Sequence, residues 1–201
     1  MEQWAQRERI VVSEPREIQR LRSLLGQRQP RHSVPLSLFF DAQGRRLRLC
    51  RLGSRDLGAL AQMYACFERD QTSLGIPPVG AQHVRDWVEG LFAKDVQLIA
   101  KHGDQVAAHA AWVRDGQGGA EVLVFVRPGY QGAGVGKKML AAVVTMSRFL
   151  GVRKLWAEVE NRNVPIIRLN QALGFHTSQW YQGTQEMELE PFAEGDPFFF
   201  Y

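Results

Sequence analysis

The sequence feature that most constrains the fold is a glycine-rich turn between an apolar run and an amphipathic run. Residues 120–126 are almost continuously apolar, which predicts a strand at the centre of a sheet. Residues 131–137 read Gln-Gly-Ala-Gly-Val-Gly-Lys. A helix is expected over residues 135–150, with Gly151 in the place of a left-handed C-terminal cap. A strand, a glycine turn and a helix are therefore predicted in immediate succession.

A turn of this kind is typical of an anion-binding site. The backbone N–H groups at the start of a helix point toward a common ligand, and the helix dipole adds about half a positive charge there. Glycines at positions 132, 134 and 136 allow the backbone to approach a bulky anion, and Lys137 adds a cation. The implied ligand is a phosphate or a pyrophosphate.

Three phosphate-binding motifs differ in where their glycines fall. A P-loop, G-x-x-x-x-G-K-[ST], requires glycine and Ser or Thr where this chain has Gln131 and Lys138. A dinucleotide fingerprint, G-x-G-x-x-G, that starts at Gly132 requires glycine where the chain has Lys137. The pattern Q/R-x-x-G-x-G/A is met in full by residues 131–136.

The rest of the chain predicts alternating strands and helices. Strands are indicated at residues 36–40, 47–51, 96–100, 106–113, 155–159 and 184–189, and helices around residues 57–67, 84–91 and 165–173. The turn at residues 41–44 joins the first two strands, as in a hairpin. This order indicates an α/β fold with a mixed sheet.

The two ends of the chain differ from the middle. Residues 1–35 are polar, rich in arginine and interrupted by prolines, so they are interpreted as an N-terminal extension in which residues 16–25 have helical spacing. Residues 36–190 form the expected domain. Residues 191–201 form a tail that ends in three Phe and one Tyr. The tail is expected to pack on its own domain, and the alternatives are a homodimer contact or a lid over a substrate site.

The net charge of +4 is unevenly distributed. The first 51 residues hold 11 arginines and 5 acidic residues, whereas the other 150 hold 14 basic and 16 acidic ones. A basic segment can bind nucleic acid, but no nucleic-acid motif accompanies it, so a solvated surface is favoured. No apolar run approaches the roughly 20 residues of a membrane helix, and the start lacks a secretory signal, so we expect a cytoplasmic protein without a membrane partner. Two cysteines, Cys50 and Cys66, indicate neither a disulfide framework nor a metal site.

In its glycine turn and a second block, the sequence resembles the GNAT family of N-acyltransferases. Residues 124–132 resemble the family's fourth strand and the loop after it. Asn163, Leu169 and the pair Gly174-Phe175 match the family pattern N-x-x-x-x-x-L-x-x-x-x-G-F. The resemblance extends over about residues 46–189. It implies a mostly antiparallel sheet with helices on both faces, splayed between its fourth and fifth strands, and acetyl-CoA as co-substrate without a metal.

The resemblance also implies roles for individual residues. Val124 and Val126 would offer backbone groups to the pantetheine arm of the cofactor, and Asn163 would contact the arm or only cap its helix. Asn170 takes the position where many members carry a tyrosine that protonates the leaving thiolate. Asn170 would hydrogen-bond the sulfur or have no role, and water or Tyr181 would then supply the proton. The pyrophosphate would be held by Gln131, Gly132, Ala133, Gly134, Val135, Gly136 and Lys137.

Amine acylation requires a neutral amine, and therefore a group that accepts the proton of the ammonium. Glu121 is the expected general base, because it is an acidic residue at the start of an apolar strand, and the alternative is an exposed charge at a strand end. His109 is the second candidate and His176 the third.

The predicted function is transfer of an acetyl group from acetyl-CoA to a small amine, a protein lysine or a protein N-terminus. The alternative is a non-catalytic acyl-CoA-binding sensor or scaffold.

Overall fold

A computed structural model describes residues 30–67, 74–93 and 97–191. The strands are β1 (Val34–Phe40), β2 (Arg46–Arg51), β3 (Gln97–His102), β4 (Gln105–Arg114), β5 (Gly119–Val126), β6 (Lys154–Glu160), β7 (His176–Trp180) and β8 (Thr184–Leu189). The helices are the short 3-10 turn η1 (Ser54–Asp56), α2 (Leu57–Tyr64), α3 (Ala81–Phe92), α4 (Val135–Phe149) and α5 (Val164–Gln171). The expected helix over residues 16–25 and the aromatic tail after residue 191 lie outside the described residues.

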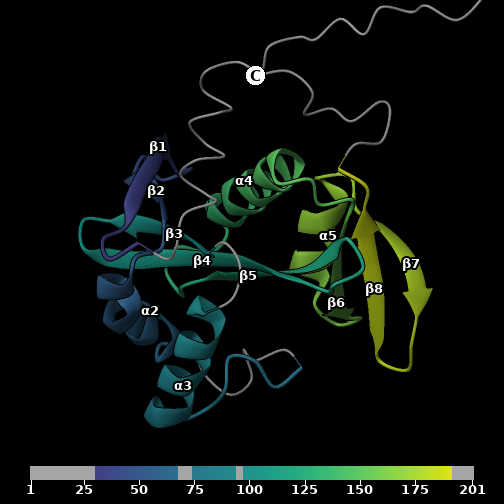
Figure 1. The fold of residues 1–201 in the computed structure, drawn as a ribbon, viewed down its shortest axis with the longest axis horizontal. Helices are drawn as coiled ribbons and strands as arrows, with labels where there is room; N and C mark the ends of the chain where they lie inside the picture. Colours follow the sequence, from purple (N-terminus) through teal and green to yellow (C-terminus); the bar gives the residue numbers. More distant parts are fainter. Residues whose placement is uncertain (1–29, 68–73, 94–96, 192–201) are drawn as a thin grey trace, which may run out of the picture.

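These strands form one sheet in the order β1-β2-β3-β4-β5-β6-β8-β7 (Figure 1). Neighbouring strands are antiparallel everywhere except between β5 and β6, which are parallel. Helices α2 and α3 cover one face of the sheet, and α4 and α5 lie on the other (Figure 1). Two apolar clusters lie between these layers, one around Leu60 and Val88, the other around Met139 and Val143. The predicted mixed, mostly antiparallel sheet with helices on both faces is confirmed.

The parallel pair β5 and β6 stays together for only three residues. Gly119 pairs with Lys154, and the last paired residues are Glu121 and Trp156. Beyond them the two strands diverge, which leaves a wedge-shaped gap inside the sheet. Counted from β2, where the family resemblance begins, β5 and β6 are the fourth and fifth strands. The predicted splay is therefore present at the predicted place.

Local signals predicted most elements correctly and missed one. The glycine turn ends at Gly134, helix α4 begins at Val135, and Gly151 follows the helix with φ of 70°. The missed element is β7, an edge strand whose residues are largely exposed. A strand without a buried face has no apolar alternation, so period-2 patterning could not reveal it.

Residues before position 36, the expected start of the domain, already contact it. Strand β1 starts at Val34, and the carbonyl groups of Pro30 and Arg31 accept hydrogen bonds from Ser54 N and Arg55 N at 2.9 and 3.0 Å. Gly53 lies so close to this segment that a Cβ there would overlap the backbone of residues 32–33. Backbone contacts of this kind leave no trace in composition, so the sequence alone does not reveal them.

Gly53→Ala should destabilise the protein by about 1–3 kcal/mol, the usual cost of forcing atoms into a packed site. The overlap falls on backbone, which cannot rotate away as a side chain can. The matched control is Gly58→Ala, since a Cβ on Gly58 in α2 meets no atom within 4 Å. That change should be neutral or stabilise by about 0.5–1 kcal/mol through helix propensity. Denaturant unfolding measures both; equal stabilities for the two variants would contradict the close packing at Gly53.

Candidate active site

A cavity of about 910 Å³ opens where β5 and β6 diverge. Its walls come from β5, the glycine turn, the start of α4, β6 and α5. The residues predicted from the sequence that line it are Glu121, Val124, Val126, Gln131, Gly132, Gly134, Gly136, Lys137, Asn163 and Asn170. Strand and loop residues that are far apart in the sequence thus meet around one space.

The backbone groups of Val124 and Val126 face this gap. Arg127 N donates to Ala107 O at 2.9 Å, so residue 127 belongs to the hydrogen-bonded pairs between β5 and β4. The register between these strands has no shift, and hydrogen-bonded pairs alternate along an antiparallel ladder. Residues 122, 124 and 126 therefore direct their N–H and C=O groups away from β4, toward β6. Where β6 has diverged, these groups face the cavity.

The glycine turn has the geometry of an anion site. Gly132 and Gly134 have φ of 69° and 81°, in the left-handed region that side chains disfavour. Gly134 directly precedes the 15-residue helix α4, whose first N–H groups have no partner inside the helix. A Cβ on Gly136 would lie 3.3 Å from Val126 and 3.4 Å from Leu169, so glycine there lets α4 approach β5 and α5 closely.

Side chains around the turn divide into two groups. Gln131 and Lys137 are exposed, and the Gln131 amide donates to Val126 O at 3.0 Å, which ties the turn to the end of β5. Ala133 and Val135 are 3% and 1% exposed, because they point into the core. Any contribution of Ala133 and Val135 to phosphate binding therefore comes from their backbone. That each of the residues predicted here binds the cofactor stays a prediction.

The wall of the cavity on the α2–α3 side carries carboxylates. Phe125 packs in the cluster under α2 and α3, and alternation along β5 puts Glu121 on the same face. On β6, Val159 is buried in the cluster under α4, so Glu158 and Glu160 also face the α2–α3 side. All three carboxylates line the cavity. They add negative charge to this wall, and the Arg162 guanidinium beside Glu160 offsets part of it.

Glu160 also joins two walls of the cavity. Its carboxylate accepts a hydrogen bond from Leu74 N at 2.9 Å and from Arg162 Nε at 2.6 Å. The bonds from Arg162 and Leu74 hold the pKa of Glu160 below its ordinary value. Leu74 and Ile76 line the cavity together with Phe67 at the end of α2, so this wall is apolar. The contact ties Leu74, in the segment before α3, to β6.

The second candidate base, His109, is enclosed in the core. It is 0% exposed, its Nδ1 lies 2.5 Å from the Tyr64 hydroxyl, and its Nε2 lies 2.8 Å from Gln97 Oε1. Burial lowers the pKa of His109 to about 3 and raises that of Tyr64 well above its ordinary value. His109 is therefore neutral at physiological pH, and the described cavity wall does not include it.

The remaining candidates occupy different settings. Asn163 caps α5, with its side chain accepting from Ile166 N at 3.4 Å, and it also lines the cavity, so both predicted roles stay open. Asn170 is 3% exposed, and its amide contacts Met187 Sδ at 3.6 Å. His176 lies on the edge strand β7, 3.6 Å from Glu188. Tyr181 is 50% exposed and is not among the described lining residues.

Residues 60–175, more than half of the chain, match the Acetyltransferase (GNAT) family. Together with the split sheet and the glycine turn, this match defines the class: the protein belongs to the GNAT family of acyl-CoA-dependent acetyltransferases.

Within the described residues, no group of three or more His, Cys, Asp or Glu is placed to hold a metal ion. None of the described helices combines the length and apolar character of a membrane span.

Two relatives illustrate the range of the family. Mycothiol acetyltransferase of Nocardiopsis dassonvillei is 31% identical over 112 residues, which are 53% of this chain and 34% of the relative. L-methionine sulfoximine/L-methionine sulfone acetyltransferase of Salmonella typhimurium is 38% identical over 55 residues, which are 27% of this chain and 32% of the relative. The chain thus spans about a third of the length of the curated relatives it matches.

Solved structures share the fold over most of the chain. The GNAT domain of S. lividans PAT superposes with a TM-score of 0.67 at 22% identity, covering 77% of this chain and 96% of that domain. The structure of yncA from Salmonella typhimurium with its cofactor acetyl-CoA gives a TM-score of 0.58 at 22% identity, covering 75% and 97%. At this identity the similarity shows the fold alone.

Gly134→Ala should remove most of the stabilisation that acetyl-CoA confers. A ligand at 100 times its dissociation constant stabilises a protein by about 2.7 kcal/mol. A side chain at φ of 81° distorts the turn and lies where the backbone would approach the pyrophosphate. Thermal unfolding with and without acetyl-CoA measures the effect.

The matched control is Gly151→Ala, at the far end of α4. Gly151 has φ of 70° with no atom within 4 Å of a built Cβ, the same situation as Gly134. Each change should cost about 1–2 kcal/mol of intrinsic stability, but Gly151→Ala should keep the full response to acetyl-CoA. A full response in Gly134→Ala would mean that the turn is not the pyrophosphate site.

His109→Gln should flatten the acid side of the stability profile. The folded protein holds the pKa of His109 at about 3, against 6.5 for an ordinary histidine, so the unfolded chain binds more protons in between. The parent should therefore lose up to about 1.4 kcal/mol per pH unit through this residue as pH falls from 6.5 toward 3, and nothing above that window. Chemical unfolding at several pH values measures the slopes; parallel profiles would mean that His109 is not held neutral.

Proposed function

We propose that the protein transfers an acetyl group from acetyl-CoA to a primary amine by direct attack, without a covalent enzyme intermediate. The observation that carries the proposal is the orientation of Val124 and Val126, whose backbone groups face the gap beside an anion-binding turn. An extended pantetheine arm would bond to these groups as a neighbouring strand would. The pyrophosphate would then lie on the N–H groups at the start of α4.

In the proposed reaction the neutral amine attacks the carbonyl carbon of the thioester. A C–N bond forms, the C–S bond breaks, and coenzyme A leaves as a thiolate. A backbone N–H of β5 that faces the gap would donate to the thioester oxygen as negative charge develops on it. Glu121 would accept the proton of the amine, directly or through water. Asn170 has no acidic proton, so the thiolate would be protonated by water.

The acceptor is proposed to be a small cationic amine. Support comes from the carboxylates of Glu121 and Glu158, which line the same side of the cavity and would attract an ammonium group. Glu160 on that side is paired with Arg162. One relative named above is an L-methionine sulfoximine/L-methionine sulfone acetyltransferase, so amino acids and their derivatives are the first acceptors to test. Release of coenzyme A across a panel of amino acids, amino sugars and lysine peptides would rank the acceptors.

A non-catalytic acyl-CoA sensor is the alternative, and Asn170 favours it because the usual proton donor is missing. Hydrolysis of acetyl-CoA without an acceptor distinguishes the two functions. An enzyme positions the thioester for attack, so water slowly replaces the amine, whereas a sensor leaves acetyl-CoA intact. Cofactor binding without turnover on any amine and without hydrolysis would favour the sensor.

A cytoplasmic location and a homodimer stay predictions.

Glu121→Gln should lower turnover by roughly 10²- to 10⁴-fold at neutral pH, the usual contribution of a positioned general base. The shape of the side chain is kept and the proton acceptor is lost. The deficit should shrink as pH rises, because more of the amine is already neutral. The matched control is Glu158→Gln on the facing strand, which removes the same charge and should change turnover less than tenfold. Equal losses in both variants would indicate that charge attraction, not proton transfer, is the role of Glu121.

A further inference from the structure

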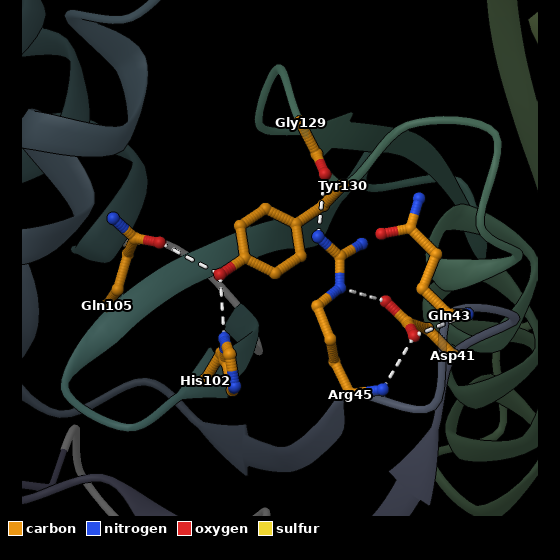
Figure 2. A network of polar contacts seen from close by, with 7 residues as sticks. All are labelled: Asp41, Gln43, Arg45, His102, Gln105, Gly129 and Tyr130. Carbon is orange, nitrogen blue, oxygen red and sulfur yellow. Dashed lines mark hydrogen bonds and ion pairs between the residues drawn. The ribbon is translucent and has the colours of Figure 1, made fainter.

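The turn between β1 and β2 contacts the glycine turn, although 84 residues separate Arg45 from Gly129 in sequence. Ala42 N donates to Ala133 O at 3.0 Å, and the Arg45 guanidinium donates to Gly129 O at 2.7 Å. The same guanidinium lies 4.1 Å above the ring centre of Tyr130 (Figure 2). One turn therefore contacts three residues of the segment 129–133.

The first turn is itself firmly built. Asp41 is 8% exposed, and its carboxylate accepts hydrogen bonds from Gln43 N and Arg45 N, both at 2.9 Å, and from Arg45 Nε at 2.6 Å (Figure 2). Gly44 completes the turn with φ of 75° and donates to Asp41 O at 3.0 Å. Burial opposes ionisation of Asp41, but the bonds from Arg45 and Gln43 outweigh it and lower its pKa. Asp41 thus orients the Arg45 guanidinium toward the glycine turn.

Tyr130 is also held from the opposite side. Its hydroxyl lies 2.9 Å from His102 Nδ1 and 2.9 Å from the side-chain amide of Gln105, whose nitrogen donates to it (Figure 2). His102 ends β3 and Gln105 begins β4, so this contact comes from a second hairpin turn. The ring of Tyr130, between Arg45 and these two side chains, is 8% exposed. Tyr130 immediately precedes the residues predicted to bind pyrophosphate.

The glycine turn needs such support for a physical reason. Gly129, Gly132 and Gly134 all take positive φ, and glycine loses more conformational freedom on ordering than any other residue. A ligand that had to order this segment by itself would bind more weakly, because ordering would reduce its affinity. Contacts from outside the turn that order it before the ligand arrives remove that cost.

We propose that Asp41 and Arg45 are positioning residues for acetyl-CoA: the turn between β1 and β2 holds residues 129–134 in the conformation that binds the pyrophosphate. The guanidinium of Arg45 acts through the turn, since its partners are Asp41, Gly129 O and the Tyr130 ring. The proposal rests on the proposed function, because it assumes that the glycine turn binds acetyl-CoA. Coupling between two sites is reciprocal, so cofactor binding must in turn stabilise the contact of Ala42 with Ala133.

Calorimetric titration with coenzyme A tests the proposal without requiring an acceptor. Arg45→Ala should raise the dissociation constant about tenfold, within the range typical of coupled sites. Arg46→Ala is the matched control, because Arg46 is the next residue and is exposed, and its replacement removes the same charge. This variant should change the dissociation constant less than twofold at equal ionic strength. In turnover, Arg45→Ala should raise KM for acetyl-CoA and leave kcat and the acceptor KM near parental values.

Two further measurements separate positioning from general stability. Hydrogen exchange at the Ala42 amide should slow when coenzyme A is added to the parent, and this protection should be lost in Arg45→Ala. Arg45→Lys keeps a cation but not the fork that joins Asp41 to Gly129, so it should give an intermediate affinity even if the Ala variant folds poorly.

The outcomes are distinct. A parent that does not bind coenzyme A would reject the proposed function. A parent that binds, with Arg45→Lys and Arg45→Ala equal to it in affinity, would overturn the positioning role. Equal losses in Arg45→Ala and Arg46→Ala would also overturn it, since they would indicate simple charge attraction. Unchanged exchange at Ala42 on binding would do the same.

Discussion

The architecture depends on one interrupted ladder of backbone hydrogen bonds. In the middle of a sheet, strands normally satisfy their N–H and C=O groups with neighbours on both sides. Here β5 keeps β4 on one side but loses β6 after Glu121, which leaves residues 122–126 without a partner strand on that side. The glycine turn, the start of α4 and the carboxylates all lie around this interruption.

The two ends of the resulting cavity have opposite electrostatic character. At the glycine turn, the N–H groups of α4 and the nearby Lys137 favour a dianionic or trianionic group. At the α2–α3 side, the carboxylates of Glu121 and Glu158 favour a cation. The proposed donor and acceptor would therefore bind at opposite ends of the cavity.

Sequence patterns predicted those parts of the site that are built from contiguous residues. The glycine turn, the start of α4 and the cap of α5 at Asn163 each follow from residues within one turn of each other, where local sterics decide the conformation. Other features of the structure could not be predicted in this way. Strand β7 has no buried face and hence no alternation, and the contact of Ala42 with Ala133 joins backbone atoms across 91 positions of chain. Burial of His109 likewise depends on Tyr64 and Gln97, which only the folded chain brings together.

The hairpin formed by β1 and β2 lies outside residues 60–175, the stretch that matches the family. Two chains with the same glycine turn, letter for letter, would therefore differ in how well that turn is held if their preceding hairpins differ. A fragment trimmed to the family boundaries would keep every motif residue and lose the contacts from Ala42 and Arg45. Under the proposed positioning role, residues that an alignment of the motif does not include would adjust the affinity for the cofactor.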